Sequence, residues 1–216
     1  MKSFEKWETE EVERTFGIKF LEISNKMNNW LDYSTNLEEF DIKRMAILKR
    51  KLQLNANFWN EEDFKVFFIM PIVELVDFYE FEKYRTFMEA TFEVTLKDVQ
   101  NNDCVLRGRV EMVVATGKQK PQTPFFFLNE YKAQVKTITD PQGQLLIAML
   151  AAQTKNENDL PIYGMYNIGQ NFFFVILEQG KYTISKQFDA TDQQDLERIV
   201  YMLKFVKNHI ENFINR

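Results

Sequence analysis

The stretch Pro124-Phe-Phe-Phe-Leu-Asn-Glu-Tyr-Lys132 decides the fold class of this 216-residue chain. Its apolar residues follow one another without alternation over 125–128, a pattern typical of a strand that is covered on both faces. The strand period of two then places Glu130 and Lys132 on the same face as Phe126. The sequence therefore predicts a central strand that ends in a carboxylate and an ammonium group side by side.

The periodicity outward from this strand predicts the remaining elements. Asn60, followed by three acids, is typical of a helix start. That helix is apolar nearly all round from Phe67 to Ile72, so we expect it to be largely buried, with a kink at Pro71. Strands are expected at 87–96, 105–115, 162–168, 172–177 and 182–188, and further helices at 144–153 and 191–214.

Length and order together predict one domain of the mixed α/β class, because domains usually contain about 100–200 residues. Residues 59–216 form the expected core, and residues 1–58, with two or three helices, form a helical annex. The single Cys104 and the single His209 exclude an internal disulfide and a Cys/His zinc site. A serine–histidine–aspartate triad built on His209 is disfavoured, because a helical pattern places that histidine at the surface.

Charge and hydropathy limit the partners. The most apolar stretch, residues 67–73, is far shorter than the ~20 residues of a membrane span, so we expect no membrane association and a cytoplasmic location. The net charge of −5 argues against a protein that coats nucleic acid non-specifically. Residues 101–140, with six bases and four acids, are the one net-basic part of the chain.

A second acid lies inside an apolar strand at Gly108-Arg-Val-Glu-Met112. If this strand neighbours the 125–132 strand, Glu111 and Glu130 could face one divalent ion. Oxygen-only ligation with open positions for water suits Mg²⁺ or Mn²⁺, and these ions accompany phosphoryl chemistry. The alternative is a buried ion pair, either Glu111 with Lys132 or Glu130 with Arg109.

The order of these elements resembles that of the PD-(D/E)XK nuclease superfamily, and most closely a group of mostly uncharacterised bacterial proteins within it. The resemblance covers most of residues 59–170. It implies a restriction-endonuclease-like αβββαβ core with a mixed central sheet. The motifs that carry it are Trp59-Asn-Glu-Glu-Asp-Phe-Lys65, Pro71-Ile-Val-Glu-Leu-Val-Asp-Phe78, Gly108-Arg-Val-Glu111, Pro124 to Lys132, Gln144-Leu-Leu-Ile-Ala-Met149 and Pro161-Ile-Tyr-Gly164.

The resemblance also implies site residues. Glu111 and Glu130 would be the metal ligands, with the Tyr131 carbonyl as a third, and Glu74 would match the helix acid that some members use through water. The simpler interpretation of Glu74 is that it forms the polar edge of a kinked helix. Lys132 would orient or deprotonate the attacking water and stabilise charge on the phosphate.

Two features weaken the match. Gln144 corresponds to a glutamine at the edge of the site in some members, and equally suits an ordinary helix start. Glu111 stands where the superfamily normally has Asp, and the extra methylene moves the carboxylate by about 1.5 Å. Because productive geometry tolerates errors of about 0.5 Å, this difference bears directly on activity.

The expected function is Mg²⁺-dependent hydrolysis of DNA that leaves a 5′-phosphate and a 3′-hydroxyl, with RNA as the second option. The alternative is a binding module on the same fold that has lost productive metal geometry. Oligomeric state stays open, a homodimer included. The expected phosphate contacts are Lys118 and Lys120, followed by Arg107 and Arg109.

Overall fold

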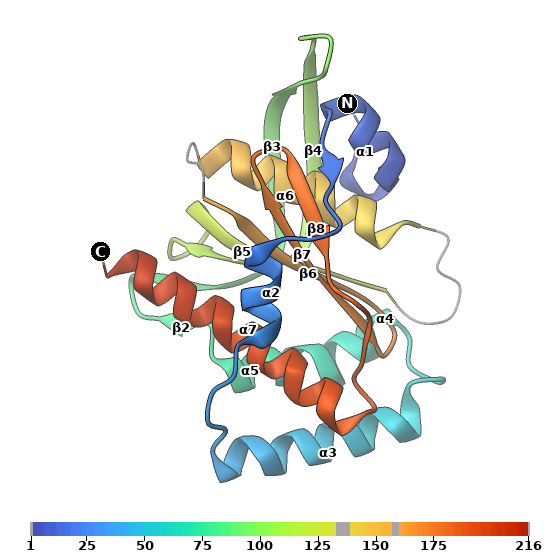
Figure 1. Ribbon diagram of the computed structural model, residues 1–216, viewed down its shortest axis with the longest axis vertical. Coiled ribbons are helices and arrows are strands. Elements are labelled where there is room, and N and C mark those ends of the chain that lie inside the picture. Colours follow the sequence, from blue (N-terminus) through green and yellow to red (C-terminus); the bar gives the residue numbers. More distant parts are fainter. Residues whose placement is uncertain (1, 133–138, 157–159, 216) are drawn as a thin grey trace.

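The computed structural model describes residues 2–132, 139–156 and 160–215, and one mixed sheet runs through them (Figure 1). In sheet order its strands are β1 (Lys19–Phe20), β8 (Lys181–Ile184), β7 (Asn171–Glu178), β6 (Ile162–Ile168), β5 (Gln122–Lys132), β4 (Asp103–Thr116), β3 (Tyr84–Lys97) and β2 (Tyr79–Glu80), with β9 (Phe188–Asp189) beside β7.

Strand direction follows from the connections. Strands β2 to β5 form an antiparallel meander, whereas β5 and β6 are parallel and are joined through helix α6 (Pro141–Asn156). Two successive strands that run parallel need such a crossover, because a tight hairpin reverses the chain and so joins only antiparallel strands. The mixed α/β class with a mixed central sheet is thereby confirmed.

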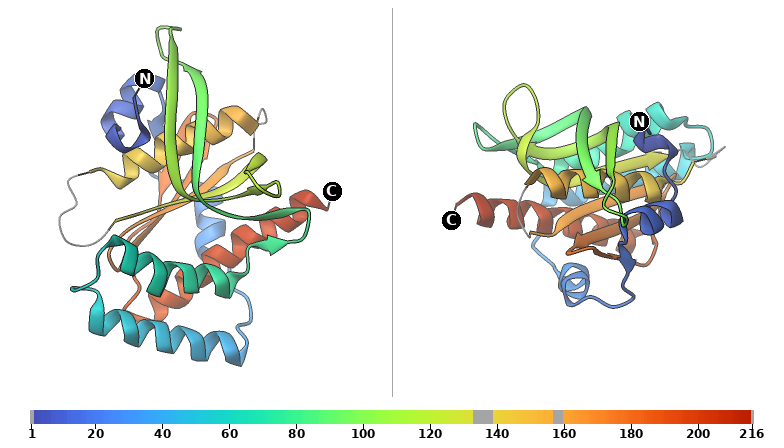
Figure 2. Two further views of the ribbon diagram at one scale, coloured as in Figure 1. Left: turned by 180° about the vertical axis from the view of Figure 1, so that it is seen from behind. Right: turned by 90° about the horizontal axis from the view of Figure 1, so that it is seen from above.

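Helices cover both faces of the sheet (Figures 1 and 2). One core cluster joins the sheet to α2 (Asn25–Asp32), α3 (Glu39–Asn55), α4 (Glu61–Phe64), η2 (Lys65–Ile69), α5 (Met70–Val76) and α7 (Gln193–Ile214). The other joins it to η1 (Phe4–Lys6), α1 (Thr9–Phe16) and α6. Within the described ranges, no helix combines the length and apolarity that a membrane crossing requires.

Strand β5 lies inside the sheet, and all four residues of its apolar run are buried, as predicted. One detail of the prediction is wrong: Phe126 packs in the core cluster opposite to that of Leu128. The pairing of β4 with β5 is irregular here, since Val114 lies opposite Phe127 and Ala115 lies opposite Phe125. Phe126 is therefore the extra residue of a β-bulge, which shifts the alternation of faces.

The helix that begins after Asn60 has the predicted cap. The Asn60 side chain accepts a hydrogen bond from the Asp63 backbone amide, and the Asp63 carboxylate accepts one from the Asn60 amide. The chain then makes a π-helical turn, η2, before Pro71 in the first turn of α5. Phe67 in η2 is 41% exposed, so the expectation of a largely buried stretch is wrong at this residue.

Residues 1–58, expected as a helical annex, contribute to the central layers as well. Strand β1 pairs in parallel with β8, and Phe4 of η1 is buried against β4. Gly108 makes room for that ring, because a Cβ there would meet Phe4 Cγ at 2.2 Å. The N-terminal segment is thus part of the core that positions the site.

Candidate active site

The end of β5 carries the carboxylate and the ammonium group that its sequence predicts. Glu130 is 6% exposed, and its Oε1 lies 2.7 Å from Lys132 Nζ. The same ammonium group lies 3.4 Å from Glu61 Oε1, at the first residue of α4. One lysine therefore joins the sheet to the start of the capped helix.

Strand pairing brings the second predicted acid to this place. Strands β4 and β5 are antiparallel neighbours, with Met112 opposite Asn129, and the next positions along the pair are Glu111 and Glu130. The Glu111 charge contributes to the raised pKa of Glu130. The sequence offered two buried ion pairs, Glu111 with Lys132 and Glu130 with Arg109, and neither is among the ion pairs of the described residues. The ion pair at this place joins Glu130 to Lys132.

The electrostatics of the cluster are dominated by Glu130. Burial raises the pKa of its carboxyl from the ordinary 4.5 to about 7, against the lowering effect of Lys132, and Glu111 and Glu61 raise it further. Burial works to lower the pKa of Lys132, but Glu130 and Glu61 more than offset this and hold it above its usual range. The site is thus a desolvated place where negative charge is crowded around one cation.

The helix acid at this site is Glu61, whereas the resemblance pointed to Glu74. Glu74 is exposed on α5, in a groove of about 450 Å³ that Phe40 and Arg44 also line. In the part of the chain that the structure describes, Glu74 forms no ion pair with Lys132, whose partners are Glu61 and Glu130. The sequence did mark Glu61 as an acid in a capped first turn, a position that the helix dipole explains without a catalytic role.

Gln144 lies in the first turn of α6, where it contacts the N-terminal segment. It is 3% exposed, and its Nε2 donates a hydrogen bond to the Glu5 carbonyl oxygen at 3.2 Å. Asp140 receives hydrogen bonds from the Thr9 amide and hydroxyl beside it. Gln144 therefore fastens the N-terminal segment to α6, and its role at the edge of the site stays a prediction.

Tyr131 contributes a buried ring as well as the predicted carbonyl. Its hydroxyl faces the Glu111 carboxylate, which brings the ring to the second predicted acid. Burial raises the pKa of this phenol far above its usual range, and Glu111 raises it further. Lys65 Nζ lies 5.7 Å from the ring centroid, so a second cation stands over this part of the site.

The predicted arginines form ion pairs on the β3–β4 ribbon. Arg109 Nη1 lies 2.6 Å from Glu89, which also accepts a hydrogen bond from Lys65 at 3.1 Å. Glu89 holds a left-handed φ of 53°, and the hydrogen bonds from Arg109 and Lys65 keep the pKa of its carboxyl below the usual range. Arg107 lies 3.7 Å from Glu93. Both arginines are exposed, so these pairs leave them accessible.

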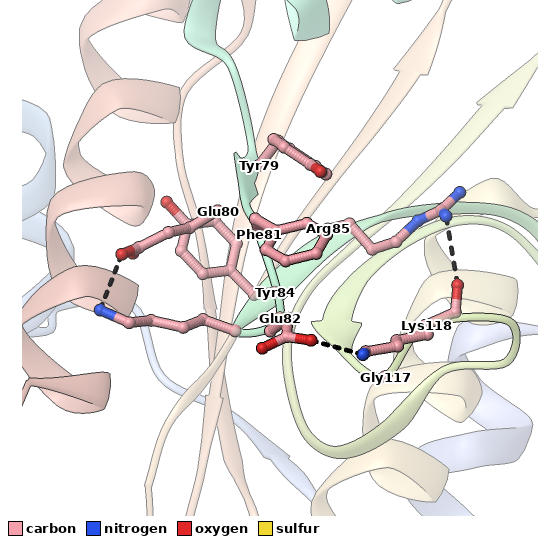
Figure 3. A pocket seen from close by; sticks show the side chains of 9 residues that line it. Tyr79, Glu80, Phe81, Glu82, Tyr84, Arg85, Gly117 and Lys118 are labelled. Carbon is pink, nitrogen blue, oxygen red and sulfur yellow. Dashed lines mark hydrogen bonds and ion pairs between the residues drawn. The ribbon is translucent and has the colours of Figure 1, made fainter.

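Lys118 follows β4, which ends at Thr116, and the five residues from Glu111 to Thr116 alone span about 17 Å of strand. Figure 3 shows Lys118 pairing with Glu82, at 2.5 Å, while Arg85 donates to the Lys118 carbonyl oxygen. These groups line a pocket of about 180 Å³. Lys120 lines a separate groove of about 490 Å³ beside β3, which Glu89 also lines.

No family model matches this chain, and a search of the curated proteins found no match. The residues that bear on the chemistry of the site are Glu61, Glu111, Glu130 and Lys132.

Proposed function

We propose that this protein is a divalent-cation-dependent phosphodiesterase that cuts DNA, built on a restriction-endonuclease-like core. The observation that carries the proposal is Lys132 Nζ at 2.7 Å from the buried Glu130, in a strand end that Glu111 and Glu61 also face. The order helix, three strands, helix and parallel strand supports it. Carboxylates and a lysine in this arrangement suit hydrolysis of a phosphodiester.

The donor atoms fit Mg²⁺ or Mn²⁺. Across the described parts of the chain, no group of three or more His, Cys, Asp or Glu side chains could hold a metal ion. Mg²⁺ requires no such group, because one or two carboxylates, water and the substrate phosphate usually complete its coordination. Glu111 and Glu130 would hold the ion, which when bound lowers the pKa of water and offsets charge on the phosphate. The crowded negative charge around Glu130 favours a cation here.

Lys132 has a defined role in this proposal. Its raised pKa keeps it protonated, so it donates hydrogen bonds and does not act as the general base. A fixed ammonium group beside the reacting phosphate stabilises the charge that develops there. Glu61 and Glu130 hold that group from two sides, which fixes its position before substrate binds. We assign Lys132 to orientation of water and stabilisation of the phosphate.

A binding module on the same fold is the second candidate. The observation in its favour is that Glu130 is already paired with Lys132, so metal binding has to loosen a contact. A metal titration followed by thermal melting, run beside a nuclease assay, separates the two candidates. The enzyme hypothesis requires both a Mn²⁺-dependent rise in melting temperature and cleavage of DNA. The binding module would be folded but would show no metal-dependent cleavage.

Metal preference gives the first prediction. We expect Mn²⁺ to activate cleavage more than Mg²⁺, and Ca²⁺ to support DNA binding without cutting, because Glu111 is longer than the usual Asp. Glu111→Asp should then raise the Mg²⁺-dependent rate by about 10-fold, since misplacement by about 1 Å can cost 10²-fold. Rates are measured on plasmid DNA with each ion, and Glu93→Asp, on exposed β3, is the matched control.

Two results contradict this prediction in different ways. A lower rate of Glu111→Asp with both ions means that the site is adapted to the longer side chain. Absence of cleavage for both forms, across single-stranded, duplex and branched DNA and RNA, rejects the enzyme and leaves the binding module.

Substrate contacts give the second prediction. Lys118→Glu together with Lys120→Glu should weaken DNA binding several-fold and flatten its salt dependence, because each removed phosphate contact reduces counterion release. Fluorescence anisotropy at several salt concentrations measures both quantities. Lys181→Glu with Lys186→Glu, on the opposite side of the sheet, is the control. Unchanged affinity would place the contact surface elsewhere, with the bases of α3 as the next candidates.

A further inference from the structure

An exposed aromatic side chain stands next to the candidate active site. Phe58 lies in the turn between α3 and α4, and its 84% exposure is the highest among the large apolar side chains that the structure describes. Only two residues separate it from Glu61, so the two Cα atoms are at most about 11 Å apart. Because Glu61 contacts Lys132, Phe58 is separated from the candidate active site by only a short length of chain.

Phe58 directly precedes Trp59 in the chain, and the Trp59 ring belongs to a group of rings and positive charge. The Trp59 and Phe67 rings lie 5.8 Å apart between centroids, at 34°. Lys51 Nζ, on α3, lies 5.6 Å from the Phe67 centroid. The described ion pairs give Lys51 no carboxylate partner, so its charge is available to a ligand. We call Lys51, Phe58, Trp59 and Phe67 the aromatic platform.

Two of these rings, Phe58 and Phe67, are exposed, while Trp59 is half-buried and packs against the main core. In the same helical segment, Phe64 and Phe68 are buried in the main core. Exposed aromatic groups that gather in one place mark a binding surface. A second copy of this chain fits poorly here, because α3 carries five bases, Lys43, Arg44, Lys49, Arg50 and Lys51, against the acids Glu39 and Asp41. Pairing α3 with itself would bring like charges together.

We propose that the aromatic platform stacks unpaired nucleobases of a single-stranded nucleic acid whose phosphates lie at the Lys132 cluster. This inference rests on the proposed function and adds the substrate class. Aromatic faces accept any base, while Lys51 meets the backbone, which is the combination that single-strand binding uses. Duplex DNA offers no base faces to Phe58, so the platform selects single strands, gaps or frayed ends.

The test measures binding without cutting. Fluorescein-labelled oligo(dT) and a closed hairpin duplex are titrated with the full chain in Ca²⁺, and anisotropy gives each Kd. Phe58→Ala should weaken oligo(dT) binding by about 10-fold and leave hairpin binding unchanged. Phe58→Trp should restore it, because an indole also stacks. Phe20→Ala removes a 53% exposed ring on β1, at the other edge of the sheet, and should match the wild type.

Each outcome decides the proposal. Equal affinity of Phe58→Ala and wild type for oligo(dT), or wild-type preference for the hairpin, overturns it. The proposal is also overturned if Phe58→Ala changes only the sedimentation of the protein or only its binding to anionic vesicles. Phe58-dependent binding of oligo(dT) with no cleavage in Mn²⁺ supports the platform and rejects the nuclease. Cleavage of oligo(dT) that Phe58→Ala slows supports both.

Discussion

Replacing Lys132 by Met is expected to lower the rate of Mn²⁺-dependent DNA cleavage by about 10²–10³-fold, the cost of removing one charge-stabilising donor. The ammonium group lies 2.7 Å from Glu130 and is held on its other side by Glu61, so it is placed before the substrate arrives. Met keeps the length of the stem without the charge. The measurement is the single-turnover rate at saturating enzyme, which excludes product release from the comparison.

The control for this variant is Lys97→Met. Lys97 is also a strand lysine paired with an acid, Asp103 at 2.6 Å, but the pair is exposed at the tip of the β3–β4 ribbon. We expect wild-type rates for Lys97→Met and a cooperative melting transition for both variants. Cleavage by Lys132→Met at the wild-type rate would remove this lysine from the mechanism.

The second large effect concerns stability and pH. Burial raises the pKa of Glu130 from 4.5 to about 7, so between these values the folded protein keeps a proton that the unfolded chain releases. The free energy of unfolding therefore falls as pH rises from about 4.5 to about 7. The shift corresponds to about 3 kcal/mol. Glu130→Gln mimics the protonated acid, so it should match the wild type near pH 4.5 and be more stable by about this amount at pH 8.

Urea denaturation of both proteins at pH 4.5, 6, 7 and 8 checks this difference. Glu93→Gln, which changes an exposed carboxylate on β3, serves as the control and should follow the wild type. The groups that face Glu130 are Lys132, Glu111 and Glu61, and neither variant replaces any of them. A wild-type stability that runs parallel to that of Glu130→Gln at every pH would mean that folding does not raise the pKa of Glu130.

The site residues on β5 could be predicted from the sequence because they depend on local pattern. Four consecutive apolar residues require cover on both faces, and Glu130 and Lys132 follow within one strand. The cap at Asn60 is equally local, since Asp63 is only three residues away. The pairing of β4 with β5 follows from short connections between successive strands.

Other parts of the site depend on contacts between distant residues. The Gln144 amide is occupied by the Glu5 carbonyl, 139 residues away, and nothing near Gln144 in the sequence indicates this. The choice of Glu61 over Glu74 depends on which end of the helical segment meets β5. The bulge at Phe126 depends on its partner strand, so strict alternation could not predict it. Phe58 was not singled out, because a single exposed aromatic residue has no periodic signal.

The parallel pairing of β1 with β8 sets the order in which the sheet can be completed during synthesis. Lys19 pairs with Lys181, so the early strand waits until about 160 further residues have left the ribosome. Until β8 forms, β1 has no strand to pair with. Once β8 has formed, its outer edge presents an open row of backbone donors and acceptors until β1 pairs with it. Nascent chains therefore pass through a stage with an unprotected sheet edge, and deletion of the first 20 residues makes that stage permanent.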